Sequence, residues 1–429
     1  MFGREIIQHF QLGLEDERLA SLYADPADVI AQRSRYIHAV QRFQDRFGEQ
    51  DISIFSAPGR TEIGGNHTDH QRGEIIAAAI TLDAIAVVSA TDEPVVTILS
   101  EGYGEITVAL DDLSIHTSEI GTTASLIRGI LHQFQQEGYL IGGFQAYITS
   151  DVLGGSGLSS SATFEVLIGT ILSGLYHDMR IDPITIARIA QYAENNYFGK
   201  PCGLMDQIAC AYGNLVHVSF RDPSHPTVEE LDLQMEAHGY ALCITDTHGS
   251  HADLTAEYAA IPNEMRQVAS YFGKADLLDV QIEEIYEHLT ALRTLAGDRA
   301  VLRALHFISE NERVGREAEA IRNQDMEAFL TLVDASGNSS YKYLQNVYPS
   351  SDVAHQGLSL ALRVSEDFLN QEGLGGVCRV HGGGFAGTIQ AFVPTSLLDK
   401  YMTRMNALFG EHSCQVLGIR RFGGIRVIG

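Results

Sequence analysis

The chain is poor in cysteine, in positive charge and in long hydrophobic runs. Its five cysteines are widely spread and form no CxxC pair, which argues against a disulfide framework or structural zinc and favours a reducing cytoplasm. Lys and Arg number 29 against 55 Asp and Glu, a net charge of −26, which argues against nucleic acid or an anionic membrane as a bulk partner. No run approaches the ~18 apolar residues of a membrane span, and the polar start does not resemble a signal peptide.

Three common active-site motifs are also missing. The sequence contains no GxxxxGK[ST] segment, so it carries no Walker-type phosphate loop. No GxGxxG element opens a strand–turn–helix unit with a following acidic residue, which argues against NAD. No GxSxG nucleophile elbow is present, so an α/β-hydrolase is not indicated.

The remaining composition is that of an ordinary globular protein. The chain has 429 residues, of which 45% are hydrophobic and 20% charged, enough for two or three domains. Strand-like and helix-like patterns mix along it, so the class is α/β or α+β. We expect strands at 52–56, 84–90, 95–99, 105–110, 144–152, 215–220, 240–245 and 388–393. We expect helices at 31–43, 125–137, 162–176 and 184–198, a turn-rich segment at 57–73, and mostly helix over 252–372.

The domain organisation follows from one linker. Residues 221–226 read Arg-Asp-Pro-Ser-His-Pro, which is typical of a connection between domains. We therefore predict an N-terminal helical extension at 1–30, a first domain at 31–220 and a second domain at 221–429.

A Gly/Ser loop at residues 151–165 lies between an apolar strand-like run and an apolar helix-like run. Glycines let a backbone approach a ligand closely, and a helix N-terminus offers free N–H groups to an anion. The loop is a candidate phosphate site, although a small polar strand-to-helix turn fits equally well on the loop alone. Its candidate ATP-binding residues are Gly155, Ser156, Gly157, Leu158, Ser159, Ser160 and Ser161.

Two further clusters carry polar chemistry. Arg60 precedes a loop that reads Asn66-His67-Thr68-Asp69-His70, which could ligate a metal or bind sugar hydroxyls, or be a solvated turn. Glu194 lies late on a predicted helix, and Asp206 follows a Pro-Cys-Gly turn. An acid pair near a phosphate loop fits one Mg²⁺ ligand and one residue facing the acceptor hydroxyl. An Asp in that position is otherwise a common helix cap.

Taken in order, these segments resemble the GHMP kinase superfamily and, within it, the galactokinase family. The matching motifs are Pro58-Gly59-Arg60 with His67-Thr68-Asp69, the loop Gly155 to Ala162, the segment Pro201 to Gln207, and the glycine-rich run Gly382 to Gly387. The resemblance covers roughly residues 30–425 and implies a two-domain fold. Its N-terminal domain would be like domain 2 of ribosomal protein S5 and its C-terminal domain ferredoxin-like.

The resemblance also implies roles for residues. Gly155 to Ser161 would wrap the ATP phosphates, and Ser161 and Glu194 would hold Mg²⁺. Asp206 would act beside the anomeric hydroxyl as base or orienting charge, supported by Arg60. The sugar pocket would be formed by Asn66, His67, Thr68, Asp69, Gly203 and Tyr258. The implied reaction is ATP-dependent phosphorylation of the C1 hydroxyl of galactose by a cytoplasmic monomer, with no nucleic-acid or membrane partner.

Two departures leave alternatives open. The family's Glu before the His is Asn66 here, and the Tyr after the Asp is His70. The resemblance implies that the family's Glu meets the C6 hydroxyl of the sugar. A neutral, shorter Asn at that position would tolerate a C6 carboxylate, which a Glu would repel, so a galacturonate 1-kinase is the second hypothesis. A non-catalytic sugar sensor of the same fold is the third. The intact Ser161, Ala162, Arg60, Glu194 and Asp206 favour an enzyme.

Overall fold

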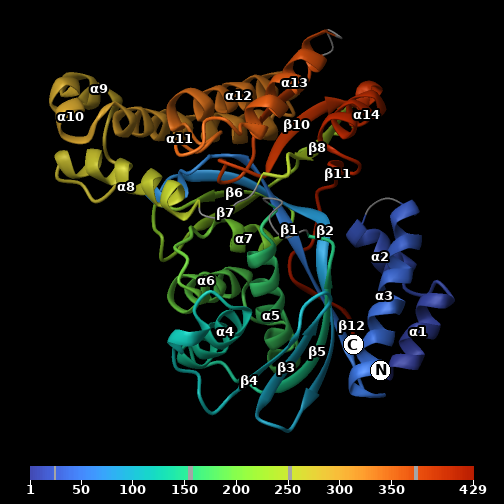
Figure 1. Ribbon diagram of the computed structural model, residues 1–429. Coiled ribbons are helices and arrows are strands. Elements are labelled where there is room, and N and C mark those ends of the chain that lie inside the picture. Colours follow the sequence, from blue (N-terminus) through green and yellow to red (C-terminus); the bar gives the residue numbers. More distant parts are fainter. Residues whose placement is uncertain (24–25, 153–157, 250–253, 372–374) are drawn as a thin grey trace.

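The computed structural model describes residues 1–23, 26–152, 158–249, 254–371 and 375–429. It contains an eight-stranded sheet and a four-stranded sheet with helices around both (Figure 1). The larger sheet has the order β12-β1-β2-β5-β3-β4, with β6 pairing β2 and β7 pairing β6; the smaller has the order β11-β8-β10-β9. The mixed α/β class is confirmed.

The strands are β1 (Ser53–Gly64), β2 (Glu74–Thr91), β3 (Val95–Ser100), β4 (Glu105–Ala109), β5 (Gly143–Ser150), β6 (Leu215–Ser219), β7 (Thr227–Leu231), β8 (Tyr240–Asp246), β9 (Val377–Val380), β10 (Thr388–Pro394), β11 (Cys414–Leu417) and β12 (Ile425–Ile428). The helices are α1 (Gly3–Gln11), α2 (Asp16–Tyr23), α3 (Pro26–Phe47), α4 (Thr123–Gln136), α5 (Ser160–His177), α6 (Pro183–Ala193), α7 (Met205–Tyr212), α8 (Thr255–Tyr271), α9 (Ile282–Glu287), α10 (Leu289–Ala296), α11 (Asp298–Arg322), α12 (Met326–Ser339), α13 (Gly357–Gln371) and α14 (Leu398–Phe409).

Helices cover both faces of the larger sheet. α4 to α7 pack on one face, and α5 buries an apolar stripe that includes Val166, Leu167 and Ile171. α1 to α3 pack on the other face, where Phe10, Tyr36 and neighbouring residues meet the outward side chains of β1, β2 and β12 (Figure 1). The N-terminal extension is therefore an integral helical layer of this sheet.

The chain returns to the first sheet after building the second. β12 pairs antiparallel with β1, and β7 pairs with β6, so both strands lie beyond residue 220 yet belong to the larger sheet. The predicted boundary near 220 remains a prediction about domains, but the sheet itself continues past it. Both chain ends lie close together beside α3 in Figure 1.

β1 is longer than its residues indicate. The turn-rich segment predicted at 57–73 is strand up to Gly64, because β1 pairs with β2 along its whole length. The register shifts between Pro58 and Arg60 and again between Glu62 and Gly64. Such bulges accommodate a proline in a strand and redirect side chains. They place Arg60 where β1 approaches the start of α5.

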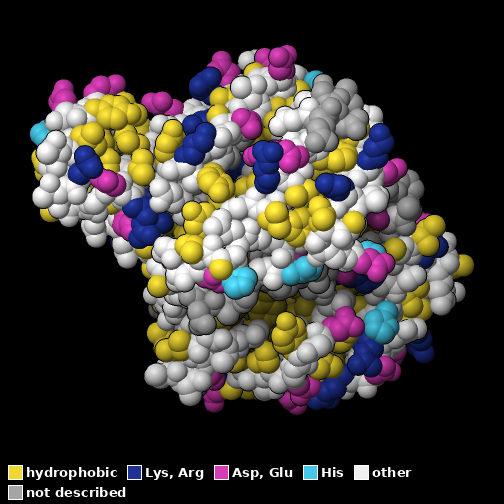
Figure 2. All heavy atoms as spheres, turned by 45° about the horizontal axis from the view of Figure 1, so that its top comes forward, with side chains coloured by type: hydrophobic (Ala, Val, Ile, Leu, Met, Phe, Trp, Pro, Cys, Tyr) yellow, Lys and Arg dark blue, Asp and Glu magenta, His cyan; other side chains and the backbone are white. Residues whose placement is uncertain are grey.

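On the one face that Figure 2 shows, charged side chains of both signs are interspersed. Lys and Arg side chains lie there singly or in small groups among Asp and Glu. Among the described helices, none is long and apolar enough to cross a membrane.

Candidate active site

Arg60 and Asp206 form a bidentate ion pair. The Nε of Arg60 on β1 donates to Asp206 Oδ1 at 2.7 Å, and its terminal amino group donates to Oδ2 at 2.9 Å. The Ser159 hydroxyl donates to the same Oδ2. Asp206 lies in the first turn of α7, where a helix dipole favours negative charge.

This environment keeps Asp206 ionised. Burial by itself would raise the pKa of Asp206, but the charge and hydrogen bonds of Arg60, with the Ser159 bond, outweigh it and hold that pKa below its usual value. A carboxylate with a lowered pKa is a weak base at neutral pH. Asp206 is therefore suited to orienting a hydroxyl and to accepting its proton late.

The structure describes residues 158–161 of the predicted phosphate loop, and α5 begins among them at Ser160. Ser159 precedes the helix in the left-handed conformation with φ 65°, without a side-chain capping bond, and Ser160 and Ser161 form its half-buried first turn. The backbone N–H of Arg60 donates to Leu158 O at 3.3 Å, which joins the loop to β1. The first-turn N–H groups of α5 suit an anion. Gly155, Ser156 and Gly157 lie outside the described residues.

Ser161 and Glu194, the two residues predicted to hold magnesium, lie in contact. Ser161 Oγ is 3.2 Å from Glu194 Oε1, and Glu194 stands where α6 ends and a π-helical turn, η3 (Glu194–Phe198), begins. Lys200 Nζ also contacts Oε1, at 3.2 Å. A hydroxyl and a carboxylate are the hard oxygen ligands that Mg²⁺ takes, usually together with substrate phosphates. The donor set therefore fits the ion.

Within the described residues, no group of three or more His, Cys, Asp and Glu side chains is arranged to hold a metal. This includes the His67, Asp69 and His70 loop, which the sequence left open as a metal site. The Ser161–Glu194 pair supplies two protein oxygens, and phosphate oxygens would have to supply others.

Glu165 and Gln207 belong to this site, although the sequence did not single them out. The Gln207 amide nitrogen donates to Glu194 Oε2 at 3.0 Å and to Glu165 Oε2 at 3.2 Å. Burial, and next the charge of Glu194, raise the pKa of Glu165 well above its usual value, so Glu165 is neutral. Its position four residues after Ser161, on the same face of α5, was the available signal.

The predicted sugar loop meets the segment that carries Asp206. Asp69 lies at the start of a 3₁₀ turn, η1 (Asp69–Gln71), and a Cβ placed on Gly203 would be 1.7 Å from its Oδ2. Gly203 thus leaves room for the Asp69 carboxylate. Thr68 is buried, and its hydroxyl lies within hydrogen-bond distance of two backbone carbonyls, Gly65 O at 2.9 Å and Glu74 O, so Thr68 closes the loop internally.

His67 and Tyr258 both contact the glycine-rich run at 382–387. His67 Nε2 lies 3.0 Å from Gly383 O, which requires the N–H tautomer at that nitrogen. Burial, and next the neighbouring His70, lower the pKa of His67 to about 4. The Tyr258 hydroxyl donates to Gly384 O at 2.9 Å, and a Cβ on Gly383 would be 2.7 Å from its ring.

Asn66 is fully buried, and its side chain is committed to contacts within the protein. Its amide nitrogen donates to Glu62 Oε1 at 3.0 Å and to Gly382 O at 2.7 Å. Its oxygen accepts from Asn346 at 2.8 Å and from Ser340 at 3.2 Å. The contact with a sugar C6 group stays a prediction. The structure gives another reason for the neutral residue.

That reason is the neighbouring carboxyl of Glu62. Burial raises the pKa of Glu62 to about 7, although Arg379, 2.8 Å away, favours its charged form. A Glu at position 66 would set a second carboxylate against Glu62 in a buried site, which is unfavourable. An Asn instead donates a hydrogen bond to it.

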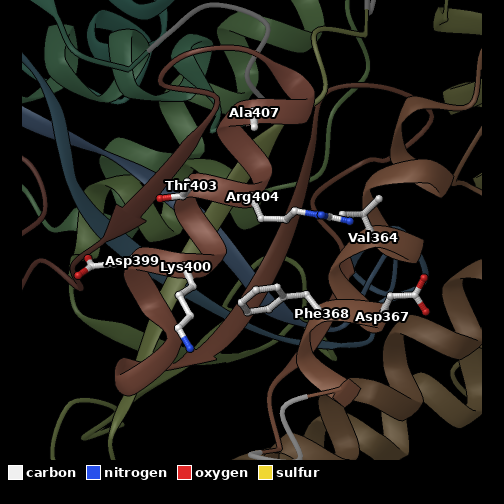
Figure 3. Close-up of a pocket in the computed structure, with 8 residues that line it drawn as sticks. All are labelled: Val364, Asp367, Phe368, Asp399, Lys400, Thr403, Arg404 and Ala407. Carbon is white, nitrogen blue, oxygen red and sulfur yellow. The ribbon is translucent and has the colours of Figure 1, made fainter.

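A groove of about 690 Å³ lies elsewhere, between α13 and α14 (Figure 3). Figure 3 shows Phe368 of α13 facing Lys400 and Arg404 of α14 across it. None of the predicted site residues lines it. The chemistry described above therefore lies outside this groove.

Two family models match the chain. GHMP kinases N terminal domain covers residues 125–214, which include Ser161, Glu194 and Asp206. Galactokinase galactose-binding signature covers residues 41–90, which include Arg60 and the loop at 66–70. The two matches together span the segments that form the ion pair and the predicted sugar loop.

Curated relatives match over most of the chain. A galactokinase of Actinobacillus pleuropneumoniae serotype 5b is 31% identical over 362 residues, covering 84% of this chain and 90% of the relative. A galactokinase of Limosilactobacillus reuteri is 29% identical over 381 residues, covering 86% and 93%.

Solved structures share the fold. Lactococcus lactis galactokinase complexed with galactose superposes with a TM-score of 0.77 at 24% identity, covering 90% of this chain and 98% of that one. Methanococcus jannaschii mevalonate kinase gives a TM-score of 0.60 at 14% identity, covering 86% and 98%. With the matched signatures and the relative at 31% identity, these likenesses place the chain in the galactokinase family of the GHMP kinases.

Proposed function

We propose that the chain transfers the γ-phosphoryl group of ATP to the C1 hydroxyl of α-D-galactose, giving galactose 1-phosphate and ADP. The observation that carries the proposal is the bidentate Arg60–Asp206 pair, held between the start of α5 and the loop of Asp69. Phosphoryl transfer needs positioned groups and charge neutralisation more than covalent help. The site offers both.

Each residue has a separate task in this proposal. Asp206 orients the C1 hydroxyl and accepts its proton late, because its lowered pKa keeps it ionised. Arg60 neutralises Asp206 and faces the charge that develops on the transferring group. Ser161 and Glu194 would hold Mg²⁺, which when bound neutralises phosphate charge. Gln207 holds the Glu194 carboxylate through its amide nitrogen, which also donates to Glu165.

The direct test of Asp206 is an Asp206→Asn variant. Asn keeps the shape but loses the charge and the proton acceptor, so we expect kcat to fall by about 10²- to 10⁴-fold. Galactose affinity, measured by calorimetry, should change by less than about fivefold, because Asn can still hydrogen-bond the hydroxyl. Asp298→Asn, in an exposed ion pair with Arg293, is the matched control. Turnover near the wild-type rate in Asp206→Asn would show that the assignment is wrong.

Location and assembly are proposed on narrower grounds. All five cysteines are free thiols, four of them buried, which favours a reducing cytoplasm. We propose that the enzyme works there as a monomer, with galactose and ATP as its ligands. Light scattering in the presence and absence of both substrates tests the assembly state.

A further inference from the structure

Asp151 directly follows the last residue of β5 and is the first residue of the predicted Gly/Ser loop. Its backbone N–H donates to Asp83 O on β2 at 2.9 Å. Its carboxylate Oδ2 lies 2.8 Å from Arg35 Nη1 and 3.4 Å from Gln32 Nε2. Both partners belong to α3, in the N-terminal helical layer, so a helix outside the predicted catalytic motifs contacts this junction.

The Arg35 side chain joins three segments. Its Nη1 donates to Asp83 Oδ1 at 2.7 Å as well as contacting Asp151. Its Nη2 donates to Asp83 O at 2.9 Å and to Thr149 O at 3.4 Å. One guanidinium therefore fixes β2, the end of β5 and the residue that follows it. The side chain is only 13% exposed, so water competes weakly for these bonds.

The other end of this contact is firmly held. Asp83 is fully buried and also binds Arg420 at 2.8 Å and the Tyr23 hydroxyl at 2.7 Å. Burial would raise the pKa of Asp83, but Arg35 and Arg420 outweigh it and hold that pKa below its usual value. The helical layer, the sheet and the segment before β12 thus meet at one carboxylate, and Arg35 extends this network to Asp151.

The junction is also packed against the far end of the loop. Val152, next to Asp151, lies in the same buried cluster as Leu158, whose carbonyl accepts from Arg60. A shift of residues 151 and 152 would therefore be felt at the start of α5, where Ser159 contacts Asp206. Interiors are close-packed and transmit such displacements.

We infer that α3 positions the ATP phosphates through the Arg35–Asp151 ion pair. The pair holds the end of β5, which leads into the predicted phosphate loop. Arg35 and Asp151 are positioning residues, because neither contacts the reacting atoms. The inference rests on the proposed ATP-dependent reaction.

The test is an Asp151→Asn variant assayed with each substrate varied in turn. Asp151 is 39% exposed on its side chain, and the variant leaves Arg35 paired with the buried Asp83, so no buried charge loses its only partner. Because a partly exposed ion pair contributes little free energy, we expect KM for ATP to rise by about three- to fivefold. KM for galactose should stay within twofold, and the melting temperature within about 2 °C. Asp151→Glu, which keeps the charge, should recover part of the ATP affinity.

The matched control is Asp16→Asn. Asp16 pairs with Arg33 in the same helical layer, but the pair makes no contact with residues 149–152. We expect no change in KM for ATP. An unchanged KM for ATP in Asp151→Asn would overturn the inference, as would an equal shift in Asp16→Asn or a parallel rise in both KM values. ATP dissociation constants of the same variants keep the test valid if wild-type protein shows no turnover, a result that would contradict the proposed function alone.

Discussion

At the scale of single residues, the site separates charged from neutral groups by their surroundings. Asp206 is held ionised by Arg60, whereas Glu165 is held neutral by burial and by Glu194. His67 is likewise held neutral, with a pKa lowered to about 4. Groups whose pKa values are driven apart in this way can take different roles at one pH.

His67 predicts a pH dependence of stability. Its folded-state pKa of about 4 lies below the unfolded value of about 6.5, so only the unfolded chain binds this proton between those values. The contribution of His67 to the free energy of unfolding is therefore fully present above about pH 6.5 and is lost as pH falls toward 4. Denaturant unfolding of wild type and His67→Gln from pH 4.5 to 8 measures it. The difference between the two curves should shrink as pH falls, and a constant difference would contradict the assignment.

At the scale of elements, local patterns predicted much of the fold but not its pairings. The strands near β3, β5 and β8 and the helices α4 to α6 follow their hydrophobic periodicity. β1 was predicted only to residue 56, because Pro58 and Gly59 are typical of turns. It continues to Gly64 because β2 pairs beside it. Such long-range pairing leaves no local signal.

The candidate site shows the same limit. The resemblance predicted that Arg60, Asp206, Ser161 and Glu194 belong to one site, and the structure shows two contacting pairs among them. The contacts of the Asn66 side chain could not be predicted from the sequence in this way. Its partner Gly382 lies 316 residues further on, and no nearby residue reveals that the amide is already satisfied.

The loop before α7 gives a prediction at the element scale. In Gly203→Ala the new Cβ would lie 1.7 Å from Asp69 Oδ2, so the Asp69 carboxylate must move. We expect KM for galactose to rise about tenfold or more, since a displacement of about 1 Å can cost 100-fold in activity. KM for ATP should change little. Gly104→Ala is the control, because nothing lies within 4 Å of that glycine. Unchanged galactose kinetics would show that Asp69 does not bind the sugar.

At the scale of the whole molecule, an early strand, β1, and the C-terminal sheet form one interface next to the candidate site. The C-terminal sheet contacts β1 through buried polar side chains. Arg379 binds Glu62 at 2.8 Å and Ile63 O at 2.6 Å, and His381 lies 3.0 Å from Thr61. The end of β1, which leads into the loop of Asn66, is thus held by the C-terminal part of the chain, which favours a preformed conformation of the predicted sugar loop.

Removing Arg379 tests how much this interface stabilises the protein. Arg379→Met leaves the Glu62 carboxylate buried without its cation, and we expect a loss of about 3–5 kcal/mol in the free energy of unfolding at pH 8. The loss should be smaller at pH 5.5, because Glu62, with a pKa raised to about 7, is then largely neutral. Arg293→Met, in an exposed pair, should lose less than about 1 kcal/mol. Equal losses in the two variants would contradict the stabilising role of the buried pair.

The most direct measurement is ADP release by the wild-type protein with ATP, Mg²⁺ and a panel of sugars: galactose, galacturonate, N-acetylgalactosamine and arabinose. We expect turnover with galactose at the highest kcat/KM and a product phosphorylated at C1, identified by phosphorus and proton NMR. Preference for galacturonate would contradict the proposal that galactose is the substrate, and would support the prediction that Asn66 contacts the C6 group of the sugar. Binding of galactose and ATP with no ADP released would contradict the proposed catalytic activity and indicate a non-catalytic sugar sensor.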